Sequence, residues 1–344
     1  MWQGLANLAW SYASLARCDE SLFLPLGDEV ASRLRSCNAQ ELANTAWAFA
    51  VSDVRSHTLF GSNSDFIAVC SEVDWNNKQL CQLHQWSLWR EEVMATSRLA
   101  AKDGASKEGR SGSANSSFAD CEDERIGCDW PGLPESLQHR AKLAFSSSKL
   151  CPSRMQTTVR YALESLGLSV AEEVRNAEGY SLDLAVEWGG VRVGVEVDGP
   201  SHFLGDGRPT GSTMLKRRQL RRFGWCIVAV PYFDWEAVRN GTDDRFEQRA
   251  AECSYLASLL DEATGLRTHA SGDGWVAIDC TSLRRDDDAA WEWDRARGWD
   301  EDDLPSYVDD GEADPCLAPP DAGALAEQPA ESTDPPSMGV RPVL

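Results

Sequence analysis

The sequence has no Cys-x-x-Cys pair and no long apolar run. Its eleven cysteines are scattered over 344 residues, and the closest two, Cys121 and Cys128, have no histidine at ligand spacing. Neither a disulfide scaffold nor a structural zinc site is therefore predicted. The longest apolar stretch, around residues 225–230, is far shorter than the roughly 20 residues that cross a bilayer, so no membrane partner is expected.

Basic residues are scarce relative to acidic ones: 33 Lys and Arg stand against 55 Asp and Glu, for a formal net charge of −22. This balance argues against a protein that coats nucleic acid through its overall field. Residues 286–344 hold 17 acidic residues and three arginines, so −14 of the −22 lies there and −8 remains for residues 1–285. A local basic face is still compatible with this distribution. The acidic, Pro-rich segment 284–344 is expected to be a disordered tail.

The sequence opens with neither a secretory signal nor an Arg-rich presequence. Its first basic residue is Arg17, and Asp19 and Glu20 follow at once. Targeting segments of both kinds begin with basic residues and few acidic ones, so neither is predicted from these residues.

An internal repeat lies within the region 1–100. The segments 3–13 (QGLANLAWSYA) and 40–50 (QELANTAWAFA) are identical at seven of eleven positions, and a degenerate third copy lies at 79–89. A period of 37–39 with a helix pair per unit predicts an α-helical solenoid. Because the first unit opens without a polar cap, we expect the chain to be the carboxyl-terminal part of a longer array or a truncated sequence.

Each repeat unit is expected to have one apolar helical face. Its residues are Leu5, Leu8, Ala9 and Tyr12 in the first copy and Leu42, Ala46, Phe49 and Ala50 in the second. Asp28 is expected to cap a helix between the two copies. The opposite face carries Asn7, Trp10, Asn44 and Trp47. These are candidates for contact with RNA bases, although packing between repeats is the favoured interpretation.

The segment 101–134 begins with a Gly- and Ser-rich stretch and is predicted to be a flexible linker. Residues 135–265 are predicted to form an α/β domain with its core at 180–240. Apolar residues alternate on both sides of Gly189-Gly190, which predicts a β-hairpin.

Further helices and a strand are predicted around this hairpin. Two helices are expected before it, over 137–145 and 155–166. After it come a basic helix over about 213–223, a short buried strand at 226–230 and a helix over roughly 243–260.

Three carboxylates are expected to converge at the end of the hairpin. Glu196 and Asp198 share one face of a strand, and Asp183 lies on the strand across the turn. Because hard divalent cations prefer oxygen ligands, all three are candidate metal ligands. Lys216 is expected to point toward them, which makes Asp183, Glu196 and Lys216 candidate catalytic residues. In the alternative interpretation, Asp198 and His202 cap the turn and bond Lys216 or an arginine as a structural network.

The basic helix carries four arginines at Arg217, Arg218, Arg221 and Arg222. A guanidinium group pairs bidentately with phosphate, so these arginines are candidate RNA-binding residues, together with Lys216 and His202. A solvated helix face without a ligand is the alternative interpretation.

Several blocks within residues 180–235 resemble a RAP domain, the RNA-binding domain described as abundant in apicomplexans. The blocks are VGVEVDGPSHF, TGSTMLKRRQLRRFGW and VAVPYFDW, in that order. The repeats LANLAW and LANTAWAFA resemble the helical repeats of octotricopeptide proteins and of FAST-kinase-domain proteins. The resemblance implies a mitochondrial or plastid RNA-binding factor that acts in RNA processing, stability or translation.

The same segment is similar, more distantly, to PD-(D/E)xK nucleases and to very-short-patch-repair endonucleases. Asp183 matches the first acidic residue of that motif and Glu196 the second. Asp198 stands where the motif has lysine, and Lys216 is a candidate substitute. The resemblance implies a Mg²⁺-dependent nuclease as an alternative function.

We therefore expect an α-helical solenoid followed by a small α/β domain of restriction-endonuclease-like, PD-(D/E)xK type and a disordered tail. The expected function is binding of single-stranded RNA without a required cofactor, with other organellar RNA-metabolism proteins as further partners. A Mg²⁺-dependent nuclease and a protein-interaction scaffold are the alternatives.

Overall fold

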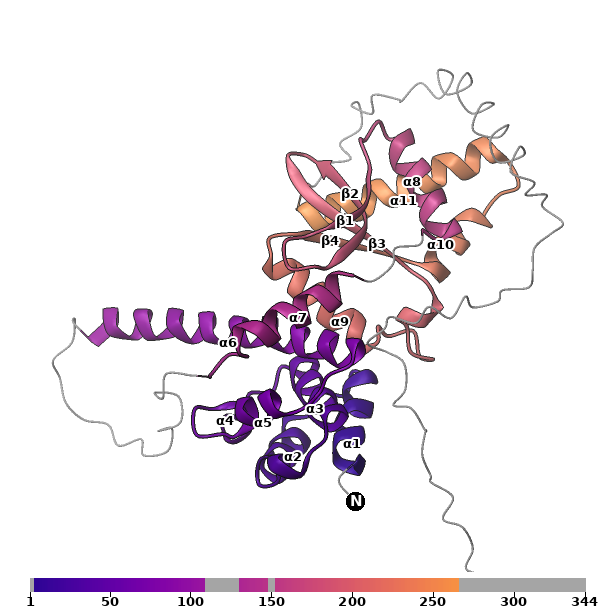
Figure 1. Cartoon of the computed structure of the whole chain (residues 1–344). Helices are drawn as coiled ribbons and strands as arrows, with labels where there is room; N and C mark the ends of the chain where they lie inside the picture. Colours follow the sequence, from indigo (N-terminus) through magenta and orange to yellow (C-terminus); the bar gives the residue numbers. More distant parts are fainter. Residues whose placement is uncertain (1–2, 109–129, 148–151, 266–344) are drawn as a thin grey trace, which may run out of the picture.

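The computed structural model describes residues 3–108, 130–147 and 152–265 (Figure 1). The predicted tail at 284–344 and most of the predicted linker lie outside these residues. None of the helices in the described ranges combines the length and hydropathy that a bilayer span needs.

The amino-terminal part is helical (Figure 1). Its helices are α1 (Gln3–Ser14), α2 (Glu20–Ala31), η1 (Leu34–Ser36), α3 (Ala39–Ser52), α4 (His57–Phe60), α5 (Phe66–Glu72), α6 (Asn77–Glu108) and α7 (Glu135–Ser146).

The three repeated segments form α1, α3 and the first turns of α6, and α3 packs against both of the others. Helices α3 and α6 begin in the same way. Asn38 and Glu41 exchange hydrogen bonds between side chain and backbone at the first, and Asn76 and Gln79 do so at the second. Each exchange satisfies two backbone N–H groups at a helix start. The repeat therefore includes the signal that starts the helix.

Equivalent polar side chains of the three helices bond one another inside the stack. Asn44 accepts from Gln82 (3.1 Å) and donates to Asn7 (3.5 Å). Trp47 donates its indole N–H to Gln85 (2.9 Å). Buried polar groups are costly unless they are paired, so these contacts favour one register of the three helices.

The predicted apolar face of the first repeat is wrong at two positions. Leu8 and Tyr12 are exposed, whereas Ala6, Ala9 and Ala13 are buried. Ala9 and Ala13 of α1 belong to the same core cluster as the apolar residues of α3, against which α1 packs. Helix α3 is covered on more than one side and is buried along nearly its whole length.

Two further expectations for this part are corrected. Asp28 lies inside α2 rather than ahead of a helix, and the helix is capped by Asp19, which accepts from the Ser21 N–H. Helix α6 continues into the predicted linker as far as Glu108. At the far end of that linker, Trp130 is fully buried and packs against Phe60 and Trp89.

The carboxyl-terminal part is a small mixed α/β unit. Its elements are α8 (Arg154–Ser165), β1 (Ala171–Arg175), β2 (Ser181–Trp188), β3 (Val191–Asp198), η3 (Pro200–His202), α9 (Gly211–Arg222), β4 (Cys226–Pro231), α10 (Tyr232–Arg239) and α11 (Arg245–Thr264). The strands form one sheet in the order β1-β2-β3-β4, in which only the β3–β4 pair is parallel. The predicted hairpin at Gly189-Gly190 is confirmed, and both glycines have positive φ. Strand β1 and helix α10 were not predicted from the sequence.

Helices cover the two faces of the sheet differently. The valines of β3 at 193, 195 and 197 pack with residues of α8 and α11. Leu220 of α9 packs on the other side with Leu182 and Ile227. Glu196 and Asp198 alternate with the valines, so they lie on the side that faces α9.

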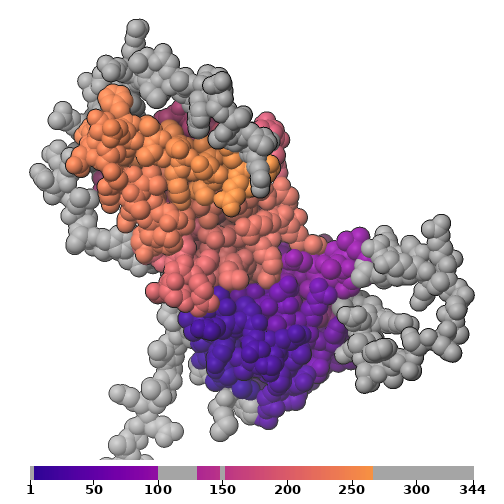
Figure 2. Space-filling view, turned by 180° about the vertical axis from the view of Figure 1, so that it is seen from behind, coloured from indigo at the N-terminus to yellow at the C-terminus, as the bar shows by residue number. Residues whose placement is uncertain are grey.

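Helix α9 lies between the sheet and the helical part (Figure 1). Its Leu215 belongs to the core of the helical part, whereas Leu220 belongs to the core of the sheet. Gln219 donates to the Gln85 carbonyl of α6 (2.9 Å) and accepts from the Tyr180 hydroxyl (2.6 Å). Seen from behind, the salmon-coloured residues of this region separate the orange α11 from the indigo α1 (Figure 2). Helix α9 therefore joins the two parts, together with the contacts of Glu178 and Tyr180 to α6 and α7.

The joint is tightly packed at Gly211, the first residue of α9. A Cβ there would overlap the Ala13 carbonyl oxygen and crowd the Val51 side chain. We predict that Gly211→Ala lowers the free energy of unfolding by about 1–3 kcal/mol, the usual cost of overpacking, in urea titrations followed by circular dichroism.

Gly4→Ala in α1 is the matched control, because a Cβ at Gly4 has no atom within 4 Å. It should leave the stability unchanged or raise it, since alanine is the better helix former. Equal effects of the two substitutions would contradict the tight contact.

Candidate functional site: a carboxylate and cation network beside α9

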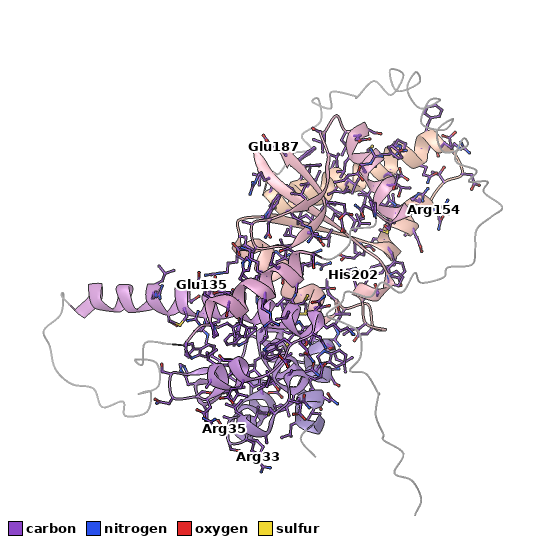
Figure 3. The ribbon with its side chains drawn as sticks, in the orientation of Figure 1. Arg33, Arg35, Glu135, Arg154, Glu187 and His202 are labelled. Carbon is purple, nitrogen blue, oxygen red and sulfur yellow. The ribbon has the colours of Figure 1, made fainter. Side chains whose placement is uncertain are left out.

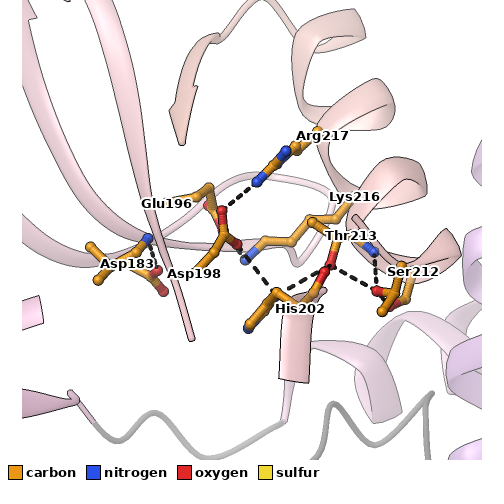
Figure 4. A network of polar contacts seen from close by, with 10 residues as sticks. Asp183, Glu196, Asp198, His202, Ser212, Thr213, Lys216 and Arg217 are labelled. Carbon is orange, nitrogen blue, oxygen red and sulfur yellow. Dashed lines mark hydrogen bonds and ion pairs between the residues drawn. The ribbon is translucent and has the colours of Figure 1, made fainter. Parts of the chain in front are cut away.

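The parallel strands β3 and β4 end side by side, with Asp198 paired to Pro231 in the register. Glu196 and Asp198 are both buried at this edge. The chain then turns through η3, which brings His202 back toward Asp198 (Figure 4). Helix α9 runs past the same edge and contributes Lys216 and Arg217 (Figure 4).

Two ion pairs join α9 to β3. Lys216 Nζ lies 2.5 Å from Glu196 Oε2. Arg217 donates to Asp198 Oδ2. A buried charge is costly unless it is paired, so these contacts explain how two carboxylates are tolerated at this edge. The contact between Lys216 and Glu196 agrees with the expectation that Lys216 points toward the carboxylates.

His202 lies on the solvent-facing side of the network, and its side chain is 35% exposed. Its Nδ1 lies 3.3 Å from Asp198 Oδ1 and 3.2 Å from the Thr213 hydroxyl. Thr213 also contacts the Thr210 hydroxyl, which caps the start of α9. The imidazole is therefore oriented by both the strand end and the helix start.

Asp183 is placed near the network but is held by backbone. Its Oδ2 accepts the Val197 N–H (2.7 Å), and its carbonyl accepts from Gln156 (3.1 Å). Gln156 also donates to Glu173 (2.9 Å). Asp183 thus links β2 to β3.

Burial dominates the electrostatics of the two paired carboxylates. Removal from water raises the pKa of Glu196 to about 8, against the opposing effect of Lys216. Burial also raises the pKa of Asp198, and Arg217 opposes that shift. Below about pH 8 the folded chain therefore favours a protonated Glu196 carboxyl that hydrogen-bonds Lys216.

The arrangement does not fit Mg²⁺ in this conformation. Glu196 Oε1 has no hydrogen-bond partner, but its other oxygen is bound to Lys216. Both oxygens of Asp198 face cationic or imidazole nitrogens, and Asp183 is bonded to the Val197 N–H. Within the described ranges, no three His, Cys, Asp or Glu residues are grouped as a metal site. These contacts support the alternative interpretation of the sequence, in which Asp198 and His202 form a structural network with Lys216 or an arginine.

The four arginines of α9 have different surroundings. Arg217 is bound to Asp198, and Arg218 donates to the carbonyls of Ala50 and Val51 at the end of α3. Arg221 and Arg222 are exposed near the end of the helix. Arg217 and Arg218 therefore bond other groups of the protein, whereas Arg221 and Arg222 lie on the surface.

The candidate RNA contacts on the repeats are placed mainly inside. Asn44 and Trp47 are buried, so neither is accessible to a base in this conformation. Asn7 and Trp10 are half-buried on α1, and Trp10 packs beside Trp47 with ring centroids 6.4 Å apart. These contacts correspond to packing between repeats, the favoured interpretation of the sequence.

An aromatic group at the same edge of the sheet was not predicted from the sequence. Phe203 follows η3, and Tyr232 and Phe233 open α10 directly after β4. Their rings lie 5.1–6.1 Å apart. A parallel pairing of the strands before GPSHF and YFDW would have predicted this meeting, because the carboxyl ends of parallel strands share one edge.

Comparison with known proteins finds a family match in this region. Residues 195–247 match the RAP domain family. The match runs from β3 into the start of α11, so it includes the whole network except Asp183.

A rice protein (Oryza sativa subsp. japonica) described as "RAP domain-containing protein, chloroplastic" is 33% identical over 84 residues. This similarity covers 24% of the chain and only 12% of the rice protein. The shared part is therefore small on both sides.

The proton held by Glu196 predicts a specific pH dependence of stability. The pKa of Glu196 is raised from 4.5 to about 8, so between these pH values the folded chain binds a proton that the unfolded chain has released. The contribution of Glu196 to stability should fall as the pH rises through this window, by at most about 1.4 kcal/mol per pH unit. Glu196→Gln does not titrate, so its free energy of unfolding should fall less from pH 5 to 8 than that of the wild type.

Glu187→Gln is the matched control, since Glu187 lies on β2 and is exposed (Figure 3). It should follow the wild-type pH profile. A Glu196→Gln profile parallel to that of the wild type would show that Glu196 is ionised throughout the range.

Proposed function

We propose that this chain is an RNA-binding protein of organellar RNA metabolism, which acts in RNA processing, stability or translation. The observation that carries the proposal is the RAP domain match over residues 195–247, because this domain type is generally RNA-binding. The chloroplastic relative from rice favours a plastid over a mitochondrion.

The surface best suited to the RNA backbone is the end of α9. Arg221 and Arg222 are exposed there, and Arg192 lies nearby with its guanidinium 4.4 Å from the ring centroid of Trp225. Strand β4 begins just after Trp225, and its first residue pairs with Val193, so Arg192 is at the same end. Arginines bind phosphates bidentately, and this local basic group stands out in a chain of net charge −22.

We assign the helical part a supporting role as well as the binding of a single-stranded segment. The bonded series from Asn7 through Asn44 to Gln82 supports a solenoid-type stack. Half-buried Asn7 and Trp10 are the members of the predicted RNA face that remain partly accessible. The order of α8, a three-stranded antiparallel meander, α9 and parallel β4 supports the proposed restriction-endonuclease-like fold.

The Mg²⁺-dependent nuclease remains the alternative, because Glu196 Oε1 is buried without a partner. Cleavage would require Glu196 and Asp198 to leave Lys216 and Arg217 before they bind a metal. Incubation of labelled single-stranded RNA with and without Mg²⁺ decides between the two functions. Cleavage that Glu196→Ala abolishes would establish the nuclease, and a protein scaffold would bind no RNA even at low salt.

Replacement of Arg221 and Arg222 together by alanine should weaken the binding of single-stranded RNA. Each phosphate contact that is lost should reduce the slope of log K against log salt by about 0.7. The measurement is fluorescence anisotropy with a labelled oligonucleotide at several salt concentrations.

Arg33→Ala plus Arg35→Ala is the matched control. These two arginines lie in the helical part, far from the sheet (Figure 3), and pair with Glu29 and Asp65. An equal loss of affinity in both double variants would show that binding follows overall charge and not the end of α9.

A further inference from the structure

The aromatic group of Phe203, Tyr232 and Phe233 forms a compact surface beside the network. The rings of Phe203 and Phe233 meet at an interplanar angle of 65°, with their centroids 5.1 Å apart. Tyr232 and Phe233 meet at 78° and 5.3 Å. Each pair is in edge-to-face contact, an arrangement that aromatic rings favour and that holds their orientations.

These rings are not enclosed in the core. Phe233 is 40% exposed, and Phe203 and Tyr232 are half-buried. Trp235, two residues further on, is fully buried and donates its N–H to Thr158. Helix α10 is therefore anchored by Trp235, and its first turn presents Phe233 to solvent.

Two basic side chains that a ligand can reach belong to the network beside these rings. His202, the neighbour of Phe203, is 35% exposed, and Lys216 is 22% exposed. Their partners Asp198 and Glu196 are buried behind them. A ligand at this edge thus meets the imidazole and ammonium groups beside the exposed carboxylate of Asp234, while Asp206 is paired with Arg208.

Exposed aromatic rings next to cationic groups match one ligand chemistry in particular. A nucleobase stacks on aromatic side chains, and the phosphate attached to its sugar pairs with cations. A stacked base can still form hydrogen bonds with water through its edges. A flat, exposed aromatic surface is therefore enough to bind it, and a deep pocket is not required.

We propose that Phe203, Tyr232 and Phe233 form a stacking site for one unpaired base of single-stranded RNA, with His202 and Lys216 beside its phosphate. This site rests on the proposed RNA-binding function and lies at the opposite end of α9 from Arg221 and Arg222. It gives the RAP segment one contact for bases and another for the backbone.

The test compares Phe233→Ala and Phe203→Leu with the wild type in anisotropy titrations against a labelled single-stranded RNA. Stacking on an aromatic side chain contributes enough that each variant should lose about 5- to 150-fold in affinity. The salt dependence should stay that of the wild type, since no phosphate contact is removed. Thermal unfolding monitored by circular dichroism checks that each variant is folded.

Phe246→Ala is the matched control, because Phe246 is 58% exposed on α11, outside the aromatic group. It should bind RNA as the wild type does. The second arm uses an oligonucleotide with abasic positions, for which wild-type and Phe233→Ala affinities should converge.

Three results would overturn the proposal. A wild type that binds RNA and a folded Phe233→Ala that binds it equally well would remove the stacking site while leaving the proposed function intact. A wild type that binds no RNA at low salt would remove both. Binding of free AMP as tight as that of the oligonucleotide would assign the site to mononucleotides instead of a strand.

Discussion

The structure depends on the burial of a strongly basic helix between two cores. Leu215 of α9 packs in the core of the helical part and Leu220 packs in the core of the sheet. The helix therefore has two apolar faces. Its cations must then either find partners inside the joint or emerge at its margins, because an unpaired buried charge is costly. Lys216 and Arg217 bind carboxylates of β3, and Arg218 binds carbonyls at the end of α3.

This sorting of charge determines what the surface offers to a ligand. The carboxylates face inward, while His202 and part of Lys216 face outward at one end of α9. Arg221 and Arg222 remain on the surface toward the other end. A chain with a net charge of −22 can thus present local cationic sites, because Glu196 and Asp198 of β3 are already paired.

Periodicity predicted much of the fold and part of the site. Asn7 and Asn44, which are 37 residues apart in the repeat, form a direct hydrogen bond. The residues that alternate around Gly189-Gly190 form the predicted hairpin. Strand β1 was missed because AEEVR has no apolar alternation. Leu8 was misassigned, since a pattern shows which faces of a helix are apolar but not which one meets a partner. The contacts of Arg218 with α3 could not be predicted for the same reason.

Because α9 belongs to both cores, we expect the helical part and the sheet to unfold together. The direct measurement is amide hydrogen exchange at increasing urea concentrations, which follows the amides of α3 and α6 in the helical core separately from those of β3 and β4 in the sheet. We expect coincident transitions with one midpoint. Two separated transitions, with the sheet intact after the helical part has unfolded, would contradict it.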